Sequence, residues 1–331
     1  MTDAAHGFTP HPLFRGPHAQ TLAGRFLRSE RGIPFRREVW TTPDGDILEV
    51  DFAEVPGRTW AQLGDRAPIA LLLHGLEGCA RTTYAHAAYR AFAERGIRSV
   101  GLNFRSCGGT KPRAQRMYHA GETSDPRWVI ERLRARFPDV PLAAIGFSLG
   151  ANILLKLLGE WGPRAPVQAA AVVSPPFDLA ACVHRIEQGF SQVYSRYLSR
   201  RLKGKLKTRL EDFEHLDLDT RAGLTGRTLR DFDEHVTAPL HGFAGADDYY
   251  ARSSSGQFVS DIARPTLVLR ALDDPFLAAD DVPRAALEGN PHVDGRLTRR
   301  GGHVAFLARG RRGRVVSWAE ETAAAWLIER L

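Results

Sequence analysis

The stretch Leu142-Ala-Ala-Ile-Gly-Phe-Ser-Leu-Gly-Ala-Asn152 runs from six residues without a polar side chain into a helical pattern. Such an apolar run is typical of a parallel strand that is covered on both faces. A tight strand-to-helix turn forces unusual backbone angles on its central residue, and small neighbours such as Gly146 and Gly150 avoid clashes there. The G-x-S-x-G pattern in this context predicts a nucleophile elbow that presents the Ser148 hydroxyl to a base and a substrate. The alternative is a plain turn with an exposed serine, which the flanking pattern disfavours.

Strand and helix patterns alternate on both sides of this turn. A Pro-Asp-Gly-Asp turn at residues 43–46 predicts a hairpin of residues 38–42 and 47–52. We expect further strands at 69–73, 99–104, 168–173 and 266–272, and helices at 84–95, 125–137, 151–161 and 315–331. This order predicts an α/β class protein with a mostly parallel sheet and helices on both faces, the α/β-hydrolase fold.

Two segments depart from the alternation. Residues 176–262 show helical patterns without a convincing buried strand, so we expect a mainly helical cap insertion within a single domain of residues 1–331. The first 35 or so residues contain four prolines, and we expect them to wrap the surface irregularly rather than form a core element.

Composition limits the class of protein. The 331 residues are 43% hydrophobic and carry a net charge of +7. Such a charge can favour anionic lipids or nucleic acid, but here it is mostly an arginine surplus, and we expect no nucleic-acid partner. The three cysteines lack CxxC spacing, and residues 1–10 lack an apolar signal region. We therefore expect a cytoplasmic protein without a transmembrane span; the sequence leaves its oligomeric state open. With no P-loop, GxGxxG or HExxH motif, we expect no cofactor and no metal.

The sequence His74-Gly-Leu-Glu-Gly78 follows the first buried run. Ester hydrolysis by a serine needs two donors for the developing oxyanion, one from the residue after the nucleophile and one from an early loop. We assign these donors to the main-chain N–H groups of Leu149 and Leu76. His74 precedes the serine, whereas this fold places its catalytic histidine last, so we expect His74 to brace the loop by hydrogen bonds.

The acid and the base should follow in that order. An acidic pair, Asp273 and Asp274, stands where the run at 266–272 ends; we prefer Asp274, before Pro275, and keep Asp273 as the alternative. His303 lies on a glycine-hinged loop before the last helix and is our candidate base. His292 is a weaker candidate because it lies in a Pro-containing turn before the preceding strand.

Two further groups of residues invite a functional interpretation. Arg105, His119 and Glu122 could bind a polar or phosphate-bearing part of a substrate, but we expect them to pair with one another, since buried polar groups need partners. The segment 194–210 is a basic amphipathic helix. It could lie on an anionic membrane, but we favour a cap helix whose apolar face covers the cleft.

Short motifs along nearly the whole chain can be compared with those of known families. They are GPHAQT at 16–21, HGLEG at 74–78, NFRSCGG at 103–109, YHAGETSD at 118–125, GFSLGAN at 146–152, YY at 249–250, DDPF at 273–276 and GGH at 301–303. In these motifs the chain resembles the YheT-type bacterial esterases of the α/β-hydrolase group and the similar ABHD1/ABHD3-type lipases of eukaryotes. One departure is Ser106, where glycine would be expected. The resemblance implies carboxylic-ester hydrolysis by a Ser148/Asp274/His303 triad, without supplying a substrate.

The residues leave three functions open. The first is a serine esterase acting on a small acyl ester or a lipid, through an acyl-enzyme that water hydrolyses. The second is an acyltransferase that uses the same triad with an alcohol as acceptor. The third is a non-catalytic binding protein on a hydrolase fold, which the presence of all three triad residues disfavours.

Overall fold

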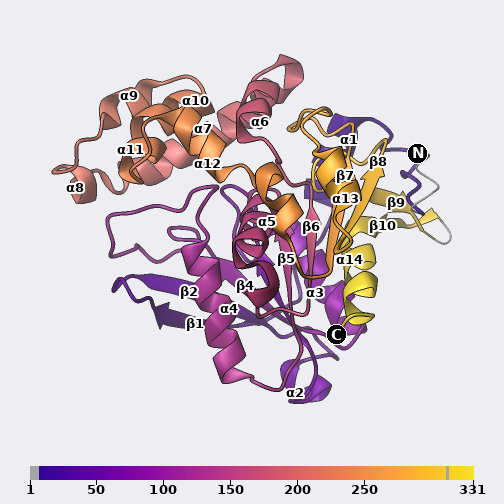
Figure 1. The fold of residues 1–331 in the computed structure, drawn as a ribbon. Coiled ribbons are helices and arrows are strands. Elements are labelled where there is room, and N and C mark those ends of the chain that lie inside the picture. Colours follow the sequence, from indigo (N-terminus) through magenta and orange to yellow (C-terminus); the bar gives the residue numbers. More distant parts are fainter. Residues whose placement is uncertain (1–6, 311–312) are drawn as a thin grey trace.

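The computed structural model describes residues 7–310 and 313–331, which form an eight-stranded sheet flanked by helices (Figure 1). The strand order is β1-β2-β4-β3-β5-β6-β7-β8. The hairpin of β1 and β2 is antiparallel, β2 pairs antiparallel with β4, and every pairing from β4 to β8 is parallel. The expected mostly parallel sheet is confirmed. The strands are β1 (Phe35–Thr41), β2 (Ile47–Ala53), β3 (Ile69–Leu73), β4 (Arg98–Asn103), β5 (Leu142–Phe147), β6 (Ala169–Val173), β7 (Thr266–Ala271) and β8 (Val293–Thr298).

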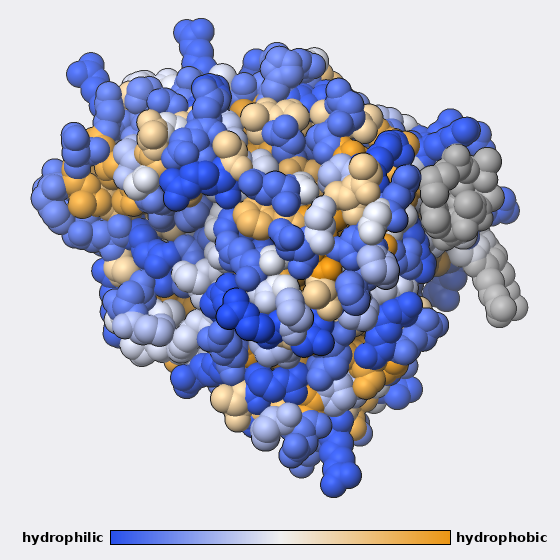
Figure 2. All heavy atoms as spheres, in the orientation of Figure 1, coloured by the Kyte–Doolittle hydropathy of each residue, from blue (hydrophilic) through white to orange (hydrophobic). Residues whose placement is uncertain are grey.

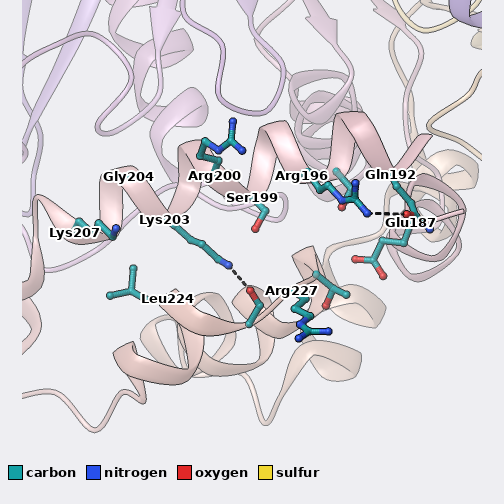
Figure 3. A pocket seen from close by; sticks show the side chains of 13 residues that line it. Glu187, Gln192, Arg196, Ser199, Arg200, Lys203, Gly204, Lys207, Leu224 and Arg227 are labelled. Carbon is teal, nitrogen blue, oxygen red and sulfur yellow. Dashed lines mark hydrogen bonds between the residues drawn. The ribbon is translucent and has the colours of Figure 1, made fainter. Parts of the chain in front are cut away.

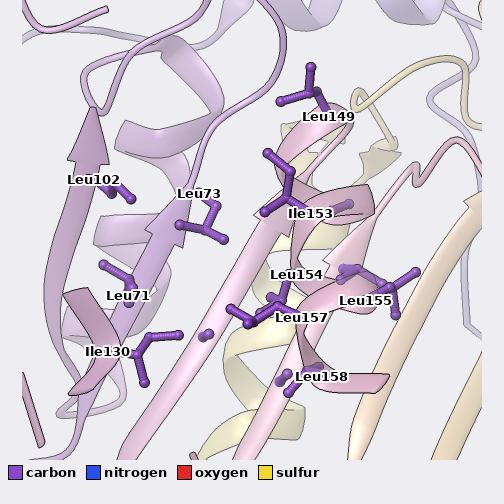
Figure 4. Packing of buried hydrophobic residues seen from close by; sticks show 14 of the residues in the cluster. Leu71, Leu73, Leu102, Ile130, Leu149, Ile153, Leu154, Leu155, Leu157 and Leu158 are labelled. Carbon is purple, nitrogen blue, oxygen red and sulfur yellow. The ribbon is translucent and has the colours of Figure 1, made fainter. Parts of the chain in front are cut away.

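Helices cover both faces of this sheet because successive side chains of a strand point to opposite sides. Leu71 and Leu73 of β3 pack with Ile130 of α4 (Ser124–Arg136) and Leu154 of α5 (Leu149–Trp161), as Figure 4 shows. Leu72, between them, belongs to the opposite cluster, which α3 (Thr83–Glu94) and α14 (Trp318–Ile328) complete. Burial on both faces explains why the central strands have no polar alternation.

The chain between β6 and β7 forms helices, and its described residues contain no strand. These helices occupy the upper part of Figure 1 and have a hydrophobic cluster of their own, around Leu206, Phe213 and Phe232. Leu76 and Phe276, from loops of the sheet, pack against that cluster. The helices are α6 (Leu179–Ile186), η3 (Gly189–Ser191), α7 (Gln192–Lys207), α8 (Leu210–Phe213), α9 (Thr220–Thr225), α10 (Leu229–Phe232), η4 (Asp233–Thr237), α11 (Ala238–Leu240), α12 (Ala246–Ser253) and η5 (Ser255–Asp261).

Two sequence-based expectations were wrong. The N-terminal segment is not irregular throughout, because residues 17–27 form the helix α1 (Pro17–Leu27). Pro17 is its first residue, a position where proline's fixed φ and missing N–H cost nothing. At the other end, α14 begins only at Trp318; Val315 and Val316 pair in β10 (Val315–Ser317) with β9 (Leu307–Arg309). We expected no signal segment in residues 1–10. Residues 1–6 of that stretch lie outside the described residues, so the expectation stays a prediction. The short helices α2 (Trp60–Leu63), η2 (Gly162–Arg164) and α13 (Arg284–Gly289) complete the fold.

Candidate active site

Ser148 lies in the turn between β5 and α5 with backbone angles of φ 52° and ψ −117°. This conformation costs energy for a residue with a side chain, and such strain is concentrated at functional sites. The two glycines are required by close packing. A Cβ on Gly150 would lie 2.4 Å from the Leu73 oxygen, and one on Gly146 would lie 2.5 Å from the Gly150 oxygen. A larger residue at position 150 would push the turn away from β3, and one at position 146 would push the first turn of α5 away from the end of β5.

The structure brings His303 and Asp274 to this serine. His303 Nε2 lies 2.9 Å from Ser148 Oγ, and His303 Nδ1 lies 2.8 Å from Asp274 Oδ2. In the tautomer that serves both contacts, Nδ1–H donates to the carboxylate and Nε2 accepts from the hydroxyl. Asp274 is buried, accepts a hydrogen bond from Phe276 N at 2.8 Å and lies 3.4 Å from Arg270 Nη1. These contacts fix the carboxylate on the side that faces His303.

The loop that carries His303 is held by side chains from distant parts of the chain. His303 N donates to Thr21 Oγ1 of α1 at 3.0 Å, and Val304 N donates to Ser174 Oγ at 3.1 Å. Gly302 N donates to Asp273 Oδ1 at 3.0 Å. Sequence reasoning missed Thr21 and Ser174 as supporting residues. The GPHAQT motif at residues 16–21 was the available signal for Thr21.

The two alternatives that the sequence left open occupy other places. Asp273 faces the main chain of the histidine loop, and burial, reinforced by the neighbouring Asp274 charge, raises its pKa to about 6. His292 uses its main-chain oxygen to accept a hydrogen bond from Thr266 N, where β7 begins. It is therefore at the amino end of the strands, whereas Ser148 follows the carboxyl end of β5.

Gly75 brings the loop after β3 against the nucleophile. A Cβ on Gly75 would lie 3.2 Å from Ser148 Cβ, and the Gly75 N–H donates to Tyr84 Oη at 2.8 Å. Leu149 is the first residue of α5, so its N–H has no partner within the helix. Within residues 7–310 and 313–331, no hydrogen bond uses the main-chain N–H of Leu76 or Leu149. Both donors are therefore available to a ligand.

His74 is fully buried beneath this loop. Its Nδ1 lies 2.7 Å from the Gly75 oxygen, and its Nε2 accepts from Phe104 N at 3.2 Å. Burial lowers the pKa of His74 to about 3, so the ring is neutral and Nδ1–H is the donor to Gly75. The geometry ties the loop after β3 to the end of β4.

The expectation that Arg105, His119 and Glu122 pair with one another was right only for His119 and Glu122, because Arg105 pairs with aspartates instead. The buried Arg105 guanidinium donates to Asp125 Oδ2 at 2.7 Å and to Asp46 Oδ2 at 2.5 Å. Glu122 is buried, accepts from Ser124 N at 2.8 Å and lies 3.7 Å from His119 Nε2. Burial lowers the pKa of His119 to about 4. Carboxylates thus occupy the Arg105 guanidinium, which leaves it little capacity for an anionic ligand.

The helix α7 lies against the site from above. Tyr194 packs on Phe276 with ring centroids 4.8 Å apart, and Phe276 stacks on His303 at 4.1 Å. Nearer its end, Lys205 Nζ lies 2.8 Å from Glu77 Oε1, next to Leu76. This helix therefore contacts the loop of the candidate oxyanion donor directly and reaches His303 through Phe276.

Among the described residues, no helix combines the length and the apolar character needed to cross a bilayer. In the same part of the chain, no group of three or more His, Cys, Asp and Glu side chains is arranged to hold a metal ion.

Comparisons with known proteins identify the family of the chain. A family model described as "alpha/beta hydrolase fold" matches residues 68–309. The Escherichia coli (strain K12) protein named "Putative esterase YheT" is 37% identical over 326 residues, which cover 98% of this chain and 94% of that protein. "Phospholipase ABHD3" of Mus musculus is 30% identical over 290 residues, 87% of this chain and 70% of that protein. The expected resemblance to both groups is confirmed.

A solved structure supports the fold alone. The esterase Pf2001 of Pyrococcus furiosus superposes with a TM-score of 0.55 at 14% identity, over 90% of this chain and 92% of that one. The conclusion follows from the family match over residues 68–309 and from these relatives, and the parallel sheet agrees with it. The chain belongs to the α/β-hydrolase family, among proteins named as esterases and phospholipases.

Proposed function

We propose that this protein is a serine hydrolase that cleaves carboxylic esters through an acyl-enzyme on Ser148. The observation that carries the proposal is the hydrogen-bonded series from Ser148 Oγ to His303 Nε2 at 2.9 Å, and from His303 Nδ1 to Asp274 Oδ2 at 2.8 Å. A serine hydroxyl is a weak nucleophile until a base takes its proton, and this arrangement supplies one.

In the proposed reaction, His303 takes the Ser148 proton while Oγ attacks the ester carbonyl carbon. The carbonyl oxygen becomes an oxyanion that the N–H groups of Leu76 and Leu149 stabilise, each worth about 3 kcal/mol in such sites. His303 then gives its proton to the leaving alcohol as the C–O bond breaks. Water, deprotonated by His303, attacks the acyl carbon; the bond from that carbon to Ser148 Oγ then breaks, His303 returns the proton to Oγ, and the acid is released. Asp274 stabilises the imidazolium in both halves of the reaction.

The surroundings of Ser148 favour an acyl ester or a lipid as substrate. Leu76, Tyr194 and Phe276 bring apolar side chains beside the triad, and they pack on the hydrophobic cluster of the insertion. We propose that the insertion formed by residues 176–262 acts as a cap that covers the acyl chain. The names of the relatives, an esterase and a phospholipase, agree with this substrate class.

Two measurements test the proposal. We expect turnover of short-chain p-nitrophenyl esters by the wild type and a loss of at least about 1000-fold in kcat for Ser148→Ala and His303→Ala. A fluorophosphonate probe should label Ser148 in folded protein. Unchanged turnover in Ser148→Ala would contradict the assignment, and absence of labelling would favour a binding protein. Ester formation in preference to acid when ethanol is added would indicate an acyltransferase instead.

A further inference from the structure

Exposed apolar side chains are concentrated in two segments. Among the described residues, nine large hydrophobic side chains are exposed, and seven of them lie in residues 13–27 or 190–197. The first segment contributes Leu13, Leu22, Phe26 and Leu27. The second contributes Phe190, Val193 and Tyr197. Single exposed apolar residues are ordinary, whereas a concentration of them indicates an interaction surface.

The two segments are in contact, and they border the candidate active site. The His18 ring of α1 lies 4.7 Å from the Phe190 ring, and His18 Nδ1 lies 3.2 Å from Tyr194 Oη. Tyr194 packs on Phe276, which stacks on His303. Figure 1 places α1 and α7 on the same, upper side of the molecule. The exposed apolar side chains therefore flank the triad.

The helix α7 has a buried face and a cationic outer face. Tyr194, Leu202 and Leu206 are buried, so the apolar side that the sequence suggested for membrane contact is already occupied. The outer face is the other side of the helix, where the exposed Val193 and Tyr197 accompany a set of cations, Arg196, Arg200, Lys203 and Lys207. In Figure 2, apolar side chains lie among hydrophilic ones over the insertion.

These cations line a groove of about 760 Å³ between α7 and residues 224–228 (Figure 3). Arg227 adds a fifth cation, and Glu187 is the one acidic residue in the lining. Lys203 reaches across to the Gly226 oxygen, and Arg196 donates to Gln192. Neither α7 nor residues 13–28 contain Asp or Glu. The local charge is thus strongly positive beside the exposed apolar residues.

We propose that this docking face, the outer side of α7 together with residues 13–27, binds an anionic lipid surface. The inference rests on the proposed function, because a hydrolase of lipid esters must meet its substrate at a membrane. Arginines and lysines flanking exposed Phe, Leu and Tyr are the combination that holds a protein at a lipid interface, where the rings enter the headgroup region and the cations contact anionic headgroups. Docking in this orientation places α1 and α7, which border the triad, at the membrane.

The test is vesicle cosedimentation of Ser148→Ala protein, which separates binding from hydrolysis. We expect binding to vesicles of phosphatidylcholine mixed with phosphatidylglycerol, little binding to phosphatidylcholine alone, and loss of binding at high salt. Replacement of three cations (Arg196→Gln, Arg200→Gln, Lys207→Gln) should weaken binding by at least about 10-fold, since each such cation contributes about fivefold.

Two further variants complete the test. The apolar triple variant Phe26→Gln, Val193→Gln and Tyr197→Gln should also lower binding by at least about 10-fold. A matched control removes the same charge elsewhere, by Arg58→Gln, Arg66→Gln and Arg164→Gln. These exposed residues precede β3 and β6 and so lie at the opposite edge of the sheet. The control should bind vesicles like the parent protein. Because all replaced residues are solvent-accessible, equal thermal midpoints are expected and would show that each variant is folded.

Three results would overturn the proposal. The first is equal weakening in the control and in the cationic variant. The second is binding to neutral vesicles as tight as to anionic ones. The third is self-association of the chain in analytical ultracentrifugation that the apolar variant abolishes, without vesicle binding, since this would assign the face to a second copy of the chain.

Discussion

Replacing Lys205 by methionine should slow the proposed reaction by loosening the loop that carries Leu76. Lys205 Nζ lies 2.8 Å from Glu77 Oε1 and 2.9 Å from Cys107 Sγ. Tyr118 Oη accepts from Glu77 N and donates to Glu77 Oε1, both at 2.8 Å. The Lys205→Met variant keeps the apolar stem of the side chain and removes its charge together with the contacts to Glu77 and Cys107.

The magnitude follows from burial. The Glu77 side chain is 1% exposed and that of Lys205 is 17% exposed. Removal of one partner from a buried ion pair costs about 3–5 kcal/mol. The Tyr118 hydroxyl remains, and Arg201 Nε lies 3.7 Å from Glu77 Oε2, so we expect a loss of stability just below that range, about 2–3 kcal/mol. Complete loss of one oxyanion donor costs about 100-fold in kcat, so a displaced Leu76 should cost about 10-fold.

The assay is a double-mutant cycle with Glu77→Gln. Urea denaturation gives stability, and a p-nitrophenyl ester series gives kcat and KM separately. We expect the pair of substitutions to be less damaging than the sum of the two, with a coupling of at least about 1 kcal/mol, because the double variant buries no unpaired charge. Lys203→Met is the matched control, since Lys203 contacts the Gly226 oxygen on the outer side of the same helix. Additive effects, or an equal loss of kcat in Lys203→Met, would refute the reasoning.

Three other predictions concern the loops around the site. Thr21→Val removes the acceptor of the His303 N–H, which should lower kcat by about 10-fold and stability by about 1–3 kcal/mol; a steady-state assay showing wild-type kcat would contradict it. Ser106 has φ 66° and a buried hydroxyl with no hydrogen-bond partner among the described residues. Ser106→Gly should therefore raise the free energy of unfolding by about 0.5–1 kcal/mol, as measured by urea denaturation. A loss of stability would refute the strain argument. Burial raises the pKa of Asp273 to about 6, so folding favours the neutral carboxyl. The stability that this gives to the folded protein is complete below about pH 4 and is lost as the pH rises through 6. The free energy of unfolding of Asp273→Asn, measured relative to wild type, should therefore rise by about 1 kcal/mol between pH 4 and pH 7, after allowance for solvent screening; a difference that does not change with pH would contradict this prediction.

Much of the fold could be predicted because the central strands have local signals. The run at 142–147 coincides residue for residue with β5, and it is apolar throughout because both faces of the sheet are covered. The elbow was equally readable, since the close approach of α5 to Gly146 and of β3 to Gly150 leaves no room for a side chain at either position. The departure at Ser106 was also visible, and its positive φ is the physical reason that glycine would be favoured there.

The helix α1 was missed because its inner face is not apolar. Its buried residues are Gln20 and Gly24. Gln20 accepts from Leu307 N at 2.7 Å and donates to the Leu307 oxygen at 3.1 Å, while a Cβ on Gly24 would lie 3.0 Å from Ala305 Cβ. A helix whose buried side consists of polar and small residues gives no hydrophobic periodicity. The supporting contacts of this helix appear only in the folded structure, because Gln20 and Leu307 are almost 290 positions apart in the sequence.

The polar inner face of α1 follows from the nature of the loop that it supports. Residues 302–306 are not part of a strand or helix, and Val304 and Phe306 adopt positive φ, so no secondary-structure ladder satisfies their backbone. Buried N–H and C=O groups without partners would cost free energy, and main-chain groups satisfy Phe306, whose N–H donates to the Gly301 oxygen and whose oxygen accepts from Trp318 N. Side chains supply partners for other groups of the loop. Thr21 and Ser174 accept from the N–H groups, and Arg28 donates to the Val304 oxygen at 2.9 Å. A loop that must present a histidine to a serine in another segment thus requires polar partners from distant segments, which is why the position of the candidate base depends on a helix near the start of the chain.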